Sequence, residues 1–75
     1  MPVSKNPYKR FSLIDNAIRK RDYPSLEKIK DLLEDEGYPV SVSTLEKDLE
    51  TMRSKFSMPI IYDRYRRGYA YSDEN

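Results

Sequence analysis

The chain has 75 residues, 37% of them hydrophobic and 36% charged, and it contains neither cysteine nor histidine. This length predicts a single domain, 1–75, with a modest core and little room for a deep substrate pocket. Without cysteine and histidine the chain cannot form disulfides and lacks the usual zinc ligands and the commonest general base. We therefore expect no enzymatic activity, no metal site and no cofactor.

No apolar run approaches the roughly 20 residues that a membrane span needs, and residues 1–10 lack the apolar stretch of a signal peptide. We therefore expect a cytoplasmic protein without a membrane partner. The net charge is only +1, but segments 1–24 and 51–75 are mainly basic and the acidic residues gather between them. Because binding depends on the local patch rather than on the sum, this balance does not exclude a nucleic-acid partner.

The first helix is expected over residues 7–21. Asn6 is a favoured N-cap, and Pro7 suits the first helical position because its missing N–H would be unpaired there anyway. Leu13 and Ala17 lie beside the apolar face of this helix, where they either widen the core or meet a partner. The centre of that face is formed by Tyr8, Phe11, Ile14 and Ile18.

The second helix is expected over residues 26–36. Pro24 disfavours helix at the residue before it, and Ser25 can cap a helix that begins at the next residue. Gly37 can adopt the left-handed conformation that ends helices. The buried face would be formed by Leu26, Ile29, Leu32 and Leu33.

The third helix is expected over residues 42–55, and it has two possible caps. Ser41 is one. Ser43 is the other, because Glu46 lies after it at the spacing of a capping box. The apolar stripe of this helix consists of Leu45, Leu49, Met52 and Phe56.

After the third helix the apolar pattern changes to that of strands, at 60–62 and 68–71. The polar segment 63–67 between them, closed by Gly68, predicts a hairpin loop. Residues 1–5 are expected to be a flexible lead-in, and 72–75 the start of a linker. The order of elements predicts an α+β fold of the winged helix-turn-helix class, with three helices followed by a two-stranded hairpin, the wing.

In this class the helix after the turn enters the major groove of DNA. Short polar side chains can approach bases or phosphates there, and Lys47 is the one cation on the outward stripe. Glu50 opposes binding unless it accepts a hydrogen bond from a cytosine amino group or lies clear of the DNA backbone. Hairpin tips usually prefer Gly, Asn or Asp, so three arginines around Tyr65 favour a wing that contacts phosphate. The residues expected to contact DNA are Ser41, Val42, Ser43, Thr44, Lys47, Thr51, Arg64, Tyr65, Arg66 and Arg67.

Segment 40–49, VSVSTLEKDL, resembles the recognition-helix motif of DeoR-like regulators. Segment 59–71, PIIYDRYRRGYAY, resembles the wing of bacterial regulators that carry a C-terminal WYL domain. The resemblance implies that Ser41 caps the third helix, that Asp48 supports the fold, and that the wing arginines reach phosphate or the minor groove. It implies double-stranded DNA as partner and a possible homodimer in the full-length regulator. Its effector-sensing C-terminal domain would lie outside these 75 residues.

An alternative hypothesis is a winged helix that binds protein and not DNA. It is favoured by the near-neutral charge, by the acidic second helix and by Glu46 and Glu50 on the third. The dependence of duplex binding on salt distinguishes the two hypotheses, because DNA binding weakens steeply as salt rises.

Overall fold

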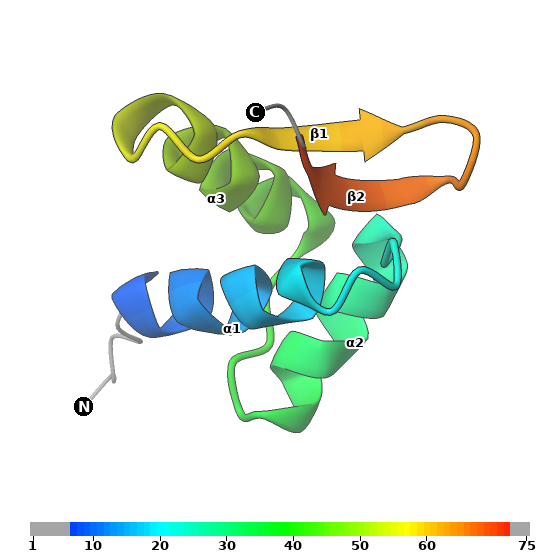
Figure 1. Ribbon diagram of the computed structural model, residues 1–75. Coiled ribbons are helices and arrows are strands. Elements are labelled where there is room, and N and C mark those ends of the chain that lie inside the picture. The colour runs from blue at the N-terminus through cyan, green and yellow to red at the C-terminus, as the bar shows by residue number, and fades with distance from the viewer. Residues whose placement is uncertain (1–6, 73–75) are drawn as a thin grey trace.

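In the computed structural model, which describes residues 7–72, three helices precede a two-stranded antiparallel sheet (Figure 1). The elements are α1 (Pro7–Arg19), α2 (Leu26–Asp35), α3 (Val42–Lys55), β1 (Ile60–Asp63) and β2 (Gly68–Tyr71). This order confirms the α+β winged-helix layout. The Asn6 cap, the lead-in 1–5 and residues 73–75 of the expected linker lie outside the described residues.

The core lies where the three helices and the start of the hairpin meet. Leu13 is half-buried and packs against it, and Ala17 is buried, so both widen the core face of α1. Phe56, expected in the core, is instead 46% exposed, because α3 ends at Lys55 and Phe56 is its C-cap. The core consists of Ile14, Ile18, Ile29, Leu33, Leu45, Leu49, Met52 and Ile60.

The ends of α1 and α2 are determined by local backbone conformation. The sequence predicts that α1 reaches residue 21, but the helix ends at Arg19, and Arg21 adopts a left-handed φ of 60°. Gly37 has a φ of 87°, and the N–H of Tyr38 donates to the carbonyl of Leu33 at 2.8 Å. With the bond from Gly37 N–H to Glu34, this is the Schellman arrangement that satisfies the last carbonyls of α2.

Of the two candidate caps of α3, the structure selects Ser41. Its Oγ accepts a hydrogen bond from the backbone N–H of Thr44 at 3.2 Å, and its backbone is extended. Ser43 is already inside the helix, so the capping box with Glu46 does not form.

The hairpin is docked on the connector between α1 and α2. The strands pair with Asp63 opposite Gly68, so β1 is one residue longer than expected. The N–H of Tyr69 donates to the carbonyl of Pro24 at 2.9 Å, and a Cβ built on Gly68 would lie 1.8 Å from the carbonyl oxygen of Tyr23. Position 68 therefore requires glycine, because the backbones of β2 and the connector approach too closely for a Cβ atom.

A buried ion pair joins α1 to α3. The Nε and Nη2 atoms of Arg10 lie 2.6 and 2.9 Å from the two carboxylate oxygens of Asp48, whose side chain is only 8% exposed. Two parallel N–H···O bonds fix the angle between the helices as well as their distance. Asp48 thus has a structural role.

Candidate nucleic-acid interface

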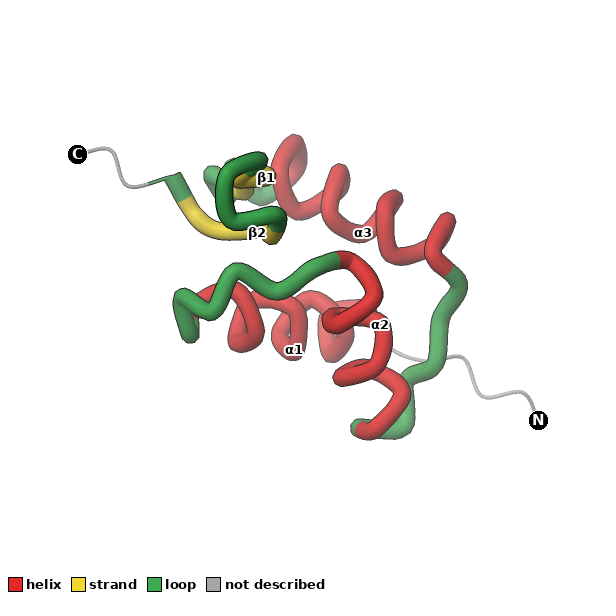
Figure 2. The backbone as a smooth tube through the Cα atoms, turned by 90° about the vertical axis from the view of Figure 1, so that its right-hand side faces the viewer, coloured by secondary structure: helices red, strands yellow, loops and turns green. Residues whose placement is uncertain are grey.

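The outward face of α3 is polar and lies opposite the buried stripe. Leu45, Leu49 and Met52 point into the core, whereas Ser43 and Lys47 are exposed on the other side. Figure 2 shows α3 along one side of the molecule, with no described segment covering its outer face. The helix is therefore positioned to offer these side chains to a groove.

The other candidates on α3 differ in how far they are available. Val42 is 40% exposed, but Thr44 and Thr51 are half-buried at the margin of the face. The hydroxyl of Ser41 donates to Oγ1 of Thr44 at 3.1 Å while it caps the helix. Ser41 and Thr44 therefore order the helix start, where backbone N–H groups favour an anion.

The negative charge of Glu50 is partly balanced within the domain. Its carboxylate lies 3.1 Å from Nη1 of Arg53, whose Nε donates to the carbonyl of Ile60 at 3.0 Å. Arg53 therefore connects the outer face of α3 to β1. The hydrogen bond from Arg53 to Ile60 was not predicted from the sequence, because Arg53 lies on no apolar stripe and its partner is a backbone carbonyl.

The four-residue tip of the hairpin is organised by Asp63. Its Oδ1 accepts hydrogen bonds from the backbone N–H groups of Tyr65 and Arg66, both at 2.9 Å, and Arg67 closes the loop at a φ of 56°. The N–H of Arg66, followed by that of Tyr65, lowers the pKa of Asp63 although desolvation acts in the opposite direction. The tip is a defined turn that sets the directions of its side chains.

The three arginines of the tip are not equivalent. The guanidinium carbon of Arg66 lies 4.6 Å from the centre of the Tyr23 ring, and its Nη1 lies 3.4 Å from Asp63. Arg64 and Arg67 are exposed and form no ion pair within residues 7–72, and Tyr65 between them is 90% exposed. Arg66 therefore ties the tip to the connector, whereas Arg64, Tyr65 and Arg67 face solvent. The role of Tyr23 was not visible in the sequence, since the contact is formed only after the hairpin docks.

The domain also has an aromatic cluster at the end where α1 begins and α3 finishes. Tyr8, Phe11 and Phe56 contact one another edge to face, with ring centres 5.7 to 6.3 Å apart. Tyr8 is 66% exposed, so the outer part of the expected α1 stripe is not core. Figure 1 places this end of the helices away from the hairpin tip.

Within residues 7–72 no group of three or more acidic, histidine or cysteine side chains is placed to hold a metal ion. None of the helices described is both long and apolar enough to cross a membrane. Comparisons with protein-family models, curated proteins and solved structures gave no match.

Proposed function

We propose that this chain is the DNA-binding domain of a transcription regulator, with α3 in the major groove and the hairpin tip on phosphate or in the minor groove. The observation that carries the proposal is the hairpin tip. Asp63 orders its backbone, and Arg64 and Arg67 project from it without an ion-pair partner among residues 7–72. Holding two cations in solvent on a defined turn favours binding to a polyanion.

The arrangement of α2, turn and α3 supports the same proposal. Ser43 and Lys47 lie on the exposed side of the first two turns of α3, where a recognition helix contacts base edges. The resemblance to DeoR-like and WYL-domain regulators extends the proposal to a bacterial cytoplasmic regulator. Its full-length form would add dimerisation and effector sensing.

The wing is tested by salt titration of binding to random duplex. Each phosphate contact contributes a slope of roughly 0.9, so Arg64→Gln with Arg67→Gln should reduce the slope by about 1.8. Arg66→Gln is the matched control, since it removes the same charge from a side chain that faces Tyr23 and Asp63. The control should change the slope less than either Arg64→Gln or Arg67→Gln alone. An unchanged slope in the double variant would refute the wing assignment.

Sequence recognition is tested by selecting bound sequences from a random duplex pool. Lys47→Ala should change the selected sequence, or cost about 1–3 kcal/mol of discrimination, if the lysine contacts guanine. Lys28→Ala on α2 is the control, because Lys28 is exposed and not on α3. If Lys47→Ala and the parent select the same sequence, Lys47 does not read a base and contacts phosphate at most.

A second candidate function is protein binding without DNA. The cluster of Tyr8, Phe11 and Phe56, in which Tyr8 and Phe56 are exposed, favours it, because aromatic side chains are enriched in interfaces between proteins. A complete lack of binding to random duplex, even at low salt, would support this second candidate and contradict the first.

A further inference from the structure

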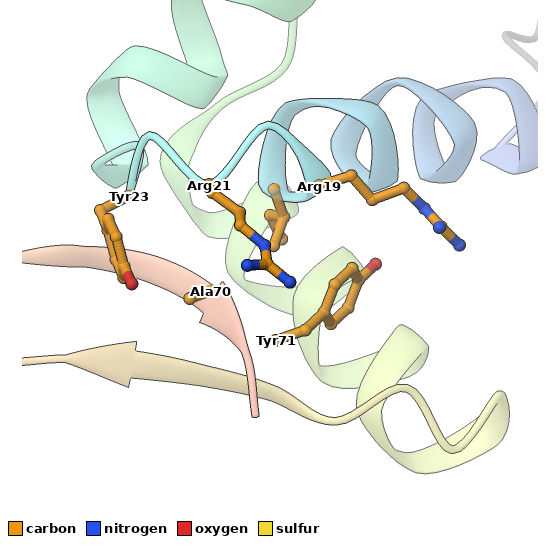
Figure 3. Close-up of a pocket in the computed structure, with 6 residues that line it drawn as sticks. Arg19, Arg21, Tyr23, Ala70 and Tyr71 are labelled. Atoms are coloured by element: carbon orange, nitrogen blue, oxygen red, sulfur yellow. The ribbon is translucent and has the colours of Figure 1, made fainter. Parts of the chain in front are cut away.

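A cleft of about 470 Å³ opens between the end of α1, the connector after it and strand β2 (Figure 3). Its lining residues are Ile18, Arg19, Arg21, Tyr23, Ala70 and Tyr71. None of the residues that line the cleft belongs to α3, and in Figure 2 the connector after α1 runs below the hairpin and α3. The cleft is therefore separate from the proposed base-reading surface.

The connector directs two side chains toward the cleft. Arg21 and Tyr23 both have left-handed backbones, with φ of 60° and 52°, a conformation that bulky side chains rarely adopt. Figure 3 shows the Arg21 guanidinium between the Tyr23 and Tyr71 side chains and above Ala70. The small side chain of Ala70 leaves the floor of the cleft open.

The charge of the cleft is positive. No carboxylate is among the described residues that line the cleft. The carboxylate of Asp15, which contacts two lining residues, is held at 3.0 Å by Nε of Arg19 and also accepts a hydrogen bond from the Tyr71 hydroxyl. Burial and then this bond raise the pKa of Tyr71, so the phenol stays neutral. The guanidinium of Arg21 has no hydrogen-bond or ion-pair partner within residues 7–72 and supplies the excess charge.

We propose that this cleft binds a small aromatic carboxylate, with the carboxylate on Arg21 and the ring against one of the two flanking tyrosines, Tyr23 or Tyr71. A planar guanidinium pairs with a carboxylate through two parallel hydrogen bonds, and tyrosine rings pack well against another ring. The volume lies in the range of about 300–1,000 Å³ typical of small-molecule sites. Such a ligand would contact α1, the connector and β2 together, so its binding would affect the position of the hairpin on the connector. The binding itself does not depend on the proposed DNA function.

The test is titration of the chain with benzoate, followed by backbone amide NMR. We expect saturable shifts at the cleft residues, with a dissociation constant on the order of 1 mM for so small a probe. Arg21→Asn, which suits a left-handed backbone, should weaken binding at least about tenfold. Ala70→Leu, which fills the floor without changing charge, should weaken it similarly. Lys55→Gln removes a cation that does not line the cleft and should leave binding unchanged.

Two further arms identify the ligand class. Inorganic phosphate and cyclohexanecarboxylate should each bind more weakly than benzoate if both the carboxylate and the ring are recognised. Equal benzoate binding by Arg21→Asn and the parent, or shifts confined to the hairpin tip, would overturn the proposal. Displacement of benzoate by duplex DNA would also overturn it, because the cleft would then be a backbone phosphate site.

Discussion

Arg10 and Asp48 show how one buried pair can determine the angle between two helices. The hydrogen bond to Asp48 is the main reason that the pKa of Arg10 is raised, so the arginine remains charged. A buried charge that loses its partner is left uncompensated, which costs more than the intact pair contributes.

We therefore predict that Asp48→Asn lowers the free energy of unfolding by about 3 kcal/mol. Urea denaturation monitored by circular dichroism measures this. Asp31→Asn, at an exposed position of α2, is the matched control and should change stability by less than about 0.5 kcal/mol. Equal stability of the two variants would show that the pair contributes no net stabilisation.

Asp63 connects the order of the hairpin tip to pH. Its pKa is lowered from 3.8, chiefly by the N–H of Arg66. A carboxyl group whose pKa is lower in the folded state stabilises the fold at pH values above its ordinary pKa. This stabilisation is lost as the pH falls through the pKa of the folded state. We predict that the amide signals of Tyr65 and Arg66 shift together with a midpoint below pH 3.8.

NMR titration of the tip amides measures this midpoint. Asp63→Asn keeps an oxygen that can accept the same hydrogen bonds, so it should preserve the turn and abolish the titration. A midpoint at or above the ordinary value of 3.8 would contradict the assigned role of Asp63.

At the scale of elements, the two glycines have different reasons to be glycine. Gly37 adopts a φ of 87° with open space around its Cβ position, whereas Gly68 touches the backbone of Tyr23. We predict that Gly37→Ala costs about 1 kcal/mol from the left-handed backbone alone. Gly68→Ala should cost about 3 kcal/mol because the hairpin must move away from the connector.

Hydrogen exchange distinguishes these two effects. The Tyr69 amide, which donates to Pro24, should lose protection in Gly68→Ala and keep it in Gly37→Ala. Similar protection of this amide in both variants would mean that the hairpin tolerates a Cβ at Gly68.

Sequence patterning predicted the bounds of α3 because a cap, an apolar stripe and a following Pro-containing segment agree there. It extended α1 too far, since the left-handed Arg21 and Tyr23 belong to the packing of the connector under the hairpin. Phe56 continues the apolar period of α3, but a period does not show where the helix ends. The same limit applies to the site. A cluster of arginines is visible in the sequence, whereas the contact of Arg66 with Tyr23 requires the fold.

At the scale of the whole molecule, the proposed DNA surface is small and of mixed charge. The outward face of α3 carries Lys47 beside Glu46 and Glu50, so most of the positive charge comes from the hairpin tip. Leu13 and Ala17, the two residues of α1 for which contact with a partner was the alternative, widen its core face instead, with Ala17 buried and Leu13 half-buried. One recognition helix covers a single half-site, and specific affinity usually requires a second reader or a second half-site.

We predict that these 75 residues alone bind duplex at or slightly tighter than the roughly 10⁻⁴–10⁻⁶ M of non-specific contact at physiological salt. Analytical ultracentrifugation would establish the oligomeric state, and titration against a selected duplex and a scrambled one would give both affinities. Joining two copies through a flexible linker is the positive control, because a second half-site raises affinity through effective concentration without any new kind of contact. The linked protein should gain at least about a hundredfold on a two-site duplex and far less on a one-site duplex. Nanomolar, sequence-specific binding by the single monomer would show instead that α3 and the hairpin tip together are sufficient for recognition.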